Sequence, residues 1–279
     1  MKKTIFVILM LLAGFGKTYA VSSEAAPIVA LETTYGRIIL RLYPETIKHR
    51  DNFLKLLNQG FYNGVLFHRV IANFMVQTGD PKSKTAVGNA TLGAGNVGYT
   101  IPAEFVYPQY YHKRGALAAA REGDKRNPLK ASSGCQFYIV QGRVFAAEEL
   151  QEMEKTNYMN LTEKLYQETV KTNQVQFNKL KIENDPEKLD AMRDSLLNEV
   201  RNMIIKNPTY KFTEQQRKDY TTIGGTPHLD GNYTVFGEVI EGLDVVEKIS
   251  KAQTAENNRP VENIVVIKAE VIKEVVGSK

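Results

Sequence analysis

Cysteine and histidine are scarce in this 279-residue chain, and tryptophan is missing altogether. The one cysteine, Cys135, excludes an intramolecular disulfide. Cys135 lies beside Gln136 in a predicted strand, which favours a buried thiol over a reactive one. The four histidines are scattered and none has a partner at metal-ligand spacing, so the sequence predicts no metal site. We also expect no bound cofactor.

Long apolar runs are missing too, except near the N-terminus. Ile5–Phe15 is about as long as a signal-peptide core and too short to cross a bilayer comfortably, and Lys2 and Lys3 precede it. Ala20 is the small residue that a signal peptidase prefers. We therefore expect residues 1–20 to be a signal peptide and the mature protein to be periplasmic or extracellular. An uncleaved membrane anchor is the alternative.

A strong excess of either charge is absent. The chain has 36 basic and 31 acidic residues, and three of the basic ones are Lys2, Lys3 and Lys17 of the predicted leader. Without the leader, 33 basic residues would face 31 acidic ones, a net charge of +2. This near balance gives no indication of a nucleic-acid partner. We expect a mature form that binds no nucleic acid and does not span a membrane.

The most informative stretch that is present is Phe67–Asp80, FHRVIANFMVQTGD. If Phe74–Thr78 is a strand, Met75 and Gln77 point the same way, because side chains alternate along a strand. Arg69 lies upstream on the preceding strand or turn. The combination suggests an apolar surface with one fixed cation and an amide that holds it. Two ordinary strands with an exposed arginine are the alternative.

This stretch closely resembles the signature of the cyclophilins, a family of peptidyl-prolyl cis-trans isomerases. Ser133–Val140, SGCQFYIV, resembles the family's GSQFFI segment, and Thr226–Ile249 resembles its LDG and VFG segment with the helix that follows. The resemblance covers roughly residues 27–143 and 223–275. It implies a mainly β fold, a closed antiparallel barrel of eight strands capped by helices. We expect one cyclophilin-like domain over residues 27–275.

Local patterns are compatible with that fold. Ile28–Leu42 has the pattern of a β-hairpin, and a helix is predicted from Pro44 to about Leu57. Gly93–Gly98 formally matches the GxGxxG motif of nucleotide-binding proteins. The motif must open a helix, and Tyr99–Pro102 cannot do so well, so we reject nucleotide binding. The stretch is instead interpreted as a glycine-rich loop.

Residues 144–222 depart from the family pattern, which has a short connection there. Apolar residues recur at helical spacing before and after Asn184-Asp185-Pro186, which predicts a turn and a helix start. Asn207-Pro208 should end the second helix. We predict an inserted helical hairpin whose two apolar stripes bury each other. The alternative is that part of its surface binds a partner protein or a client chain. The residues that define the stripes are Leu150, Met153, Leu161, Leu165, Leu189, Met192, Leu196, Val200 and Met203.

The resemblance also implies roles for single residues. It makes Arg69 the catalytic cation and Gln77 the residue that orients it. The residues implied to bind substrate are Phe74, Met75, Arg121, Gln136, Phe137, Tyr138, Leu229 and Tyr233. Several positions depart from the family pattern. Tyr138 replaces a usual Phe, and Tyr233 replaces a frequent His. Arg121 stands where the family often has Asn, and Ala119 stands where Met is common. These departures put turnover and inhibitor sensitivity in question more than binding.

The predicted function is therefore that of a peptidyl-prolyl cis-trans isomerase which assists the folding of exported proteins. Its expected partners are proline-containing polypeptides, with a further partner possible at the helical insertion. The alternative is a chaperone or protein-binding module on a cyclophilin barrel, with weak or no isomerase activity and the hairpin as its binding surface.

Overall fold

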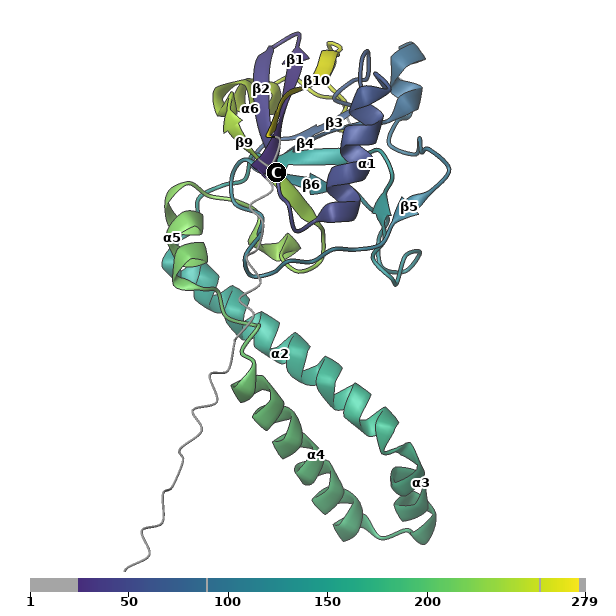
Figure 1. The fold of residues 1–279 in the computed structure, drawn as a ribbon. Helices are drawn as coiled ribbons and strands as arrows, with labels where there is room; N and C mark the ends of the chain where they lie inside the picture. The colour runs from purple at the N-terminus through teal and green to yellow at the C-terminus, as the bar shows by residue number, and fades with distance from the viewer. Residues whose placement is uncertain (1–24, 89, 256, 276–279) are drawn as a thin grey trace, which may run out of the picture.

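The computed structural model describes residues 25–88, 90–255 and 257–275. The predicted signal peptide, residues 1–20, lies outside the described residues. Figure 1 shows a rounded β domain from which a long helical hairpin projects. Within the described ranges, no helix combines the length and the apolar character needed to cross a membrane.

Eight antiparallel strands form the main sheet, in the order β10-β1-β2-β9-β6-β8-β4-β3. Their bounds are β1 (Ala25–Thr33), β2 (Gly36–Leu42), β3 (Arg69–Ile71), β4 (Met75–Thr78), β6 (Ala116–Ala119), β8 (Phe137–Val140), β9 (Val235–Glu241) and β10 (Val266–Val275). A separate two-stranded pair consists of β5 (Thr100–Ile101) and β7 (Ser132–Ser133). The predicted hairpin is confirmed as β1 and β2, with Thr33 opposite Gly36.

The fold is mainly β, as predicted, but the predicted closed barrel is wrong, because the sheet is an open half-barrel. The two edge strands, β10 and β3, do not pair with each other in the part of the chain that the structure describes. β3 is too short to extend the ladder, with three residues. Backbone hydrogen bonds from the preceding loop bridge the gap instead. Phe67 N–H donates to the Ile264 carbonyl at 2.9 Å, and Val266 N–H donates to the Val65 carbonyl at 2.8 Å.

Helix α1 (Ile47–Asn58) lies over the sheet (Figure 1), and its buried residues are His49, Phe53, Leu56 and Leu57. The ring centroid of Phe53 lies 5.0 Å from that of Tyr62, 5.1 Å from that of Phe137 and 5.5 Å from that of Phe236. Burying one such side chain contributes about 1.5–3 kcal/mol. Helix α6 (Leu243–Ser250) adds Val245, Val246 and Ile249 to the same core.

The N-terminus of α1 is capped from a distant loop. Thr46, at the N-cap position, makes no side-chain hydrogen bond there. Instead, the Glu104 carboxylate accepts the backbone N–H groups of Lys48 and His49, each at 3.0 Å, and contacts His49 Nδ1 at 2.7 Å. Burial opposes ionisation of Glu104, but these hydrogen bonds outweigh it and lower its pKa. Burial also lowers the pKa of His49, against the effect of Glu104.

We predict that this cap makes stability depend on pH. The folded pKa of Glu104 lies below its unfolded value of about 4.3, so the carboxylate stabilises the fold above that pH. This contribution is lost as pH falls through the folded pKa. Glu104→Gln should lower the unfolding free energy by about 1 kcal/mol at pH 7. Urea unfolding at pH 7 and pH 3 should show a difference from wild type that shrinks in acid. A constant difference would contradict the assignment.

Residues 144–222 are largely helical. They form α2 (Ala147–Thr172), α3 (Gln174–Glu183), α4 (Pro186–Lys206) and α5 (Glu214–Thr222). The predicted second helix is found as α4, which starts at Pro186 after Asp185, whose side chain accepts the Lys188 N–H at 3.0 Å. The first arm was predicted without the break at Asn173, and α5 was not predicted. The name "hairpin" is used below for α2 to α4.

The arms of the hairpin pack against each other, whereas its base packs on the β domain. Leu196, Val200 and Ile204 are the buried residues of α4, so the stripe ends on Ile204 rather than on the predicted Met203. At the base, a second group of side chains, called the base cluster here, joins α5 to the β domain. Its members are Phe145, Leu150, Phe212 and Tyr220, with Tyr111 and Met153 at its edge.

Candidate active site

Arg69 is held by an amide from the neighbouring strand. β3 and β4 form a hairpin whose register places Arg69 opposite Gln77. Arg69 Nη1 donates to Gln77 Oε1 at 3.2 Å. Burial lowers the pKa of Arg69 and nearby Tyr233 opposes this, but a guanidinium stays protonated in proteins. The site therefore contains a permanent, half-buried cation with a fixed orientation.

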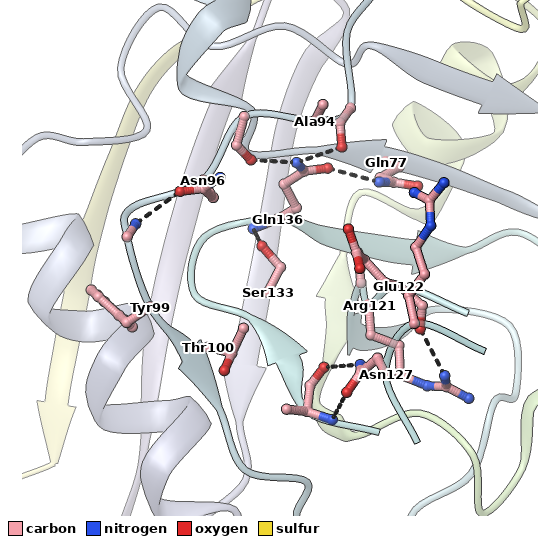
Figure 2. A pocket seen from close by; sticks show the side chains of 16 residues that line it. Gln77, Ala94, Asn96, Tyr99, Thr100, Arg121, Glu122, Asn127, Ser133 and Gln136 are labelled. Atoms are coloured by element: carbon pink, nitrogen blue, oxygen red, sulfur yellow. Dashed lines mark hydrogen bonds between the residues drawn. The ribbon is translucent and has the colours of Figure 1, made fainter. Parts of the chain in front are cut away.

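The hydrogen bonds continue beyond Gln77. Gln77 Nε2 donates to Gln136 Oε1 at 3.0 Å, and Gln136 Nε2 donates to the carbonyls of Gly93 and Gly95 at 2.9 and 2.7 Å (Figure 2). Because each amide is engaged at both ends, neither can rotate without breaking a bond. This series from Arg69 to the glycine loop is called the Arg69 chain below.

Asp80, the last residue of the Phe67–Asp80 motif, holds the glycine loop in place. Its fully buried carboxylate accepts the N–H groups of Gly93 and Gly95 at 2.6 and 3.1 Å. A side chain at Gly95 would collide with it, since an added Cβ would lie 1.8 Å from Asp80 Oδ1. The motif therefore supplies both the cation and the anchor of the loop that orients it.

An apolar cluster, separate from the core, lies beside Arg69. The Arg69 guanidinium carbon is 5.9 Å from the centroid of the Phe74 ring. Five of the residues predicted to bind substrate belong to this cluster, which we call the site cluster. They are Met75, Tyr138 and Leu229, which are buried, and Phe74 and Tyr233, which are partly exposed. The arrangement combines an apolar surface with an adjacent hydrogen-bond donor.

Comparison with known proteins agrees with this geometry. The family model described as cyclophilin-type peptidyl-prolyl cis-trans isomerase/CLD matches residues 28–184 and 169–271. The chain belongs to the cyclophilin family. The activity of this family is peptidyl-prolyl cis-trans isomerisation, as its description states.

Similar proteins support the same family. A Staphylococcus saprophyticus protein named as a peptidyl-prolyl cis-trans isomerase is 28% identical over 245 residues, which cover 87% of this chain and 90% of that protein. A Streptococcus pyogenes relative, whose name adds a phosphatase to the isomerase, is 27% identical over 252 residues, 89% of this chain but 39% of the relative. A solved cyclophilin-type isomerase from Cryptosporidium parvum has a TM-score of 0.51 at 19% identity and covers 89% of this chain and 99% of that one. The last likeness shows the fold.

Phe137 does not lie with the other predicted cyclophilin site residues. Its ring is 2% exposed and packs in the core against Phe53 and Tyr62. The cause is strand alternation, because Tyr138 faces the site cluster and its neighbour must then face the core. Its placement does not support the predicted contact with substrate.

Arg121 lies at the edge of the site, but its guanidinium is bound by protein groups. Its Nε donates to the Asn232 carbonyl at 2.8 Å, and its Nη1 donates to Asp124 Oδ1 at 2.6 Å. The guanidinium carbon also lies 4.3 Å from the centroid of the Tyr233 ring. Arg121 therefore supports the position of Tyr233.

A cavity of about 570 Å³ adjoins the cyclophilin site and shares Gln77 and Gln136 with it. In Figure 2, Tyr99 and Thr100 lie across this cavity from Arg121 and Glu122. The sequence did not predict the cavity, although the glycine loop that forms one wall was noticed as a GxGxxG match. Among the described residues, no group of three or more His, Cys, Asp or Glu side chains could hold a metal ion.

Proposed function

We propose that this protein is an exported peptidyl-prolyl isomerase that assists the folding of proline-containing polypeptides by non-covalent catalysis at Arg69. One observation carries the proposal: a cation held by the Gln77 amide, which Gln136 holds in turn, lies against an apolar surface of the right character for a prolyl ring. Membership of the cyclophilin family supports it.

The reaction needs little chemistry. Rotation about an X–Pro bond breaks amide resonance and has a barrier of roughly 18–20 kcal/mol. In the twisted state the prolyl nitrogen regains its lone pair and can accept a hydrogen bond. A guanidinium beside that nitrogen donates to the twisted state and not to the planar one, which is the differential binding that catalysis requires.

Each part of the site has a task in this mechanism. Phe74, Met75 and Leu229 bind the prolyl ring and exclude water, which strengthens the contact with Arg69. Gln77 and Gln136 keep Arg69 in place, so little reorganisation is needed when the amide twists. The function is tested by the cis-to-trans conversion of a short X–Pro peptide, which the protein should accelerate at catalytic concentration. No acceleration would refute the proposal.

A second role, client binding, is favoured by the hairpin. Its apolar side chains are not all buried, since Val175 and Ile182 are 86% and 85% exposed and Ile205 is 75% exposed. We propose that the hairpin binds unfolded client chains, or another partner, in addition to the isomerase activity.

Export is proposed from the leader. Residues 1–20 combine a basic start, an apolar core and a small residue at the end. We predict that protein purified from its native host begins at or near Val21, which intact-mass spectrometry would show. Recovery of the uncleaved chain from a membrane fraction would refute this. Cys135 is compatible with an oxidising compartment because it is buried.

A further inference from the structure

Four buried side chains connect the site cluster to α5 at the base of the hairpin. The Tyr138 hydroxyl lies 3.0 Å from His112 Nε2, and His112 Nδ1 lies 3.0 Å from Asp230 Oδ1. The Tyr220 hydroxyl donates to Asp230 Oδ2 at 2.6 Å. His112 and Tyr220 are 0% exposed and Tyr138 is 4% exposed. We call these residues the Tyr138–Tyr220 connection.

The chemistry of the four side chains determines which atoms donate and which accept the hydrogen bonds of the connection. The Asp230 carboxylate can only accept, and it accepts both the backbone N–H of His112 at 2.9 Å and the Nδ1–H of its ring. In the neutral imidazole, Nε2 is then an acceptor, and the Tyr138 hydroxyl donates a hydrogen bond to it. Every polar side-chain group of the connection has a partner, so the arrangement is well determined.

Two buried residues of the site cluster are linked to this connection. Tyr138 is one buried member of the cluster, and Leu229, directly before Asp230, is another. Tyr220 belongs to the base cluster. A displacement of Asp230 or His112 would therefore move Tyr138 and Leu229, which form part of the proposed proline-binding surface. The Arg69 chain contains neither of them.

We propose that His112 and Asp230 are positioning residues of the isomerase, and that Tyr220 couples the shape of the proline-binding surface to α5 at the hairpin base. His112 holds Tyr138 by a hydrogen bond to the Tyr138 hydroxyl, and Asp230 holds His112. Asp230 also fixes Leu229, because the two residues are adjacent in the backbone. The inference rests on the proposed function, since it concerns how well the prolyl ring is bound.

Tyr220→Phe is the mildest way to test it. The change keeps the ring in the base cluster but removes a donor from a buried carboxylate, which must then rearrange or remain partly unpaired. KM for an X–Pro peptide should rise roughly fivefold, the order expected for loss of one such hydrogen bond. Because the Arg69 chain is untouched, kcat should stay within about twofold.

Three further variants make the test specific. Tyr138→Phe breaks the other end of the connection, and the double variant tests coupling. If the two sites are coupled, the rise in KM of the double variant is smaller than the product of the single rises. Tyr111→Phe is the matched control, because its hydroxyl donates to Asp219 of the same helix α5 at 2.5 Å and lies outside the connection. Its KM should equal that of wild type.

The outcomes separate the possibilities. A rise in KM for Tyr220→Phe but not for Tyr111→Phe, at similar melting temperatures, supports the inference. Equal rises in KM for Tyr220→Phe and Tyr111→Phe would mean that any loosening of α5 disturbs the site, which overturns the inference. Multiplicative effects on KM in the Tyr138/Tyr220 double variant would mean that the two positions are not coupled, which also overturns it. If wild type itself does not accelerate the reaction, the proposed function fails. If wild type is active and Tyr220→Phe matches it, this inference alone fails.

Discussion

Replacing Arg69 with alanine is expected to lower kcat/KM on a short X–Pro peptide by roughly a hundred- to a thousandfold, the usual cost of removing a donor aimed at developing charge in the transition state. The donor cannot be replaced by water in the same position, because Phe74 and the rest of the site cluster flank the guanidinium. The loss should appear mainly in kcat, since the prolyl ring is bound by other residues.

The fold should survive this change. Arg69 is half-buried and its side chain donates to Gln77, a neighbour on the adjacent strand, so the melting temperature should move by a few degrees at most. Arg69→Lys is the matched control, because it keeps the charge but loses the planar fork, and it should have intermediate activity. A kcat/KM like that of wild type in the alanine variant would refute the mechanism.

The sequence predicted the centre of the site because its residues lie close together along the chain. Arg69 and Gln77 belong to one short hairpin, and period-two alternation with the family resemblance was enough to place them near Met75 and Phe74. Strand alternation and the family resemblance predict different places for Phe137. With Tyr138 in the site cluster, alternation puts its neighbour Phe137 on the core side of the strand, where its ring packs against Phe53.

The remaining features depend on contacts between distant segments, which local patterns do not show. Glu104 caps a helix that starts 57 residues before it in the chain. Gln136 is held by carbonyls of the glycine loop, and Asp80 orders that loop through backbone N–H groups, which are the same for every residue type. The open edge of the sheet likewise depends on the shortness of β3, which no single residue indicates.

The contacts at the base of the hairpin indicate how far the hairpin can be shortened. Glu154 accepts the Phe212 N–H at 2.7 Å, and Leu150 and Phe212 share the base cluster with Tyr111 of the β domain, so the base belongs to that domain. Above it, the rings of Tyr158 and Tyr210 lie 5.1 Å apart. A short Gly/Ser linker that replaces residues 160–208 can therefore close the chain and keep the base. A longer deletion that includes the base should destabilise the β domain.

The shortened protein should keep its activity on a short X–Pro peptide within about twofold, because the Arg69 chain and the Tyr138–Tyr220 connection remain. Its acceleration of the refolding of a proline-limited protein should fall by about tenfold or more, since the hairpin would no longer raise the local concentration of the client. Equal activity on the protein substrate would refute client binding, and equal loss on both substrates would show that the hairpin arms support the site.

Point variants identify the surface that binds. Val175 and Ile182 are seven residues apart on α3, nearly two helical turns, so they share one face, and both are highly exposed. Changing both to serine in the full-length protein should reproduce a large part of the loss on the protein substrate. Changing the exposed Gln176 and Lys179 of the same helix to serine is the matched control and should have no effect. The peptide assay should be unchanged in both, because neither pair lies near Arg69. If the control pair lowers activity as much as the apolar pair, apolar contacts on α3 are not what holds the client.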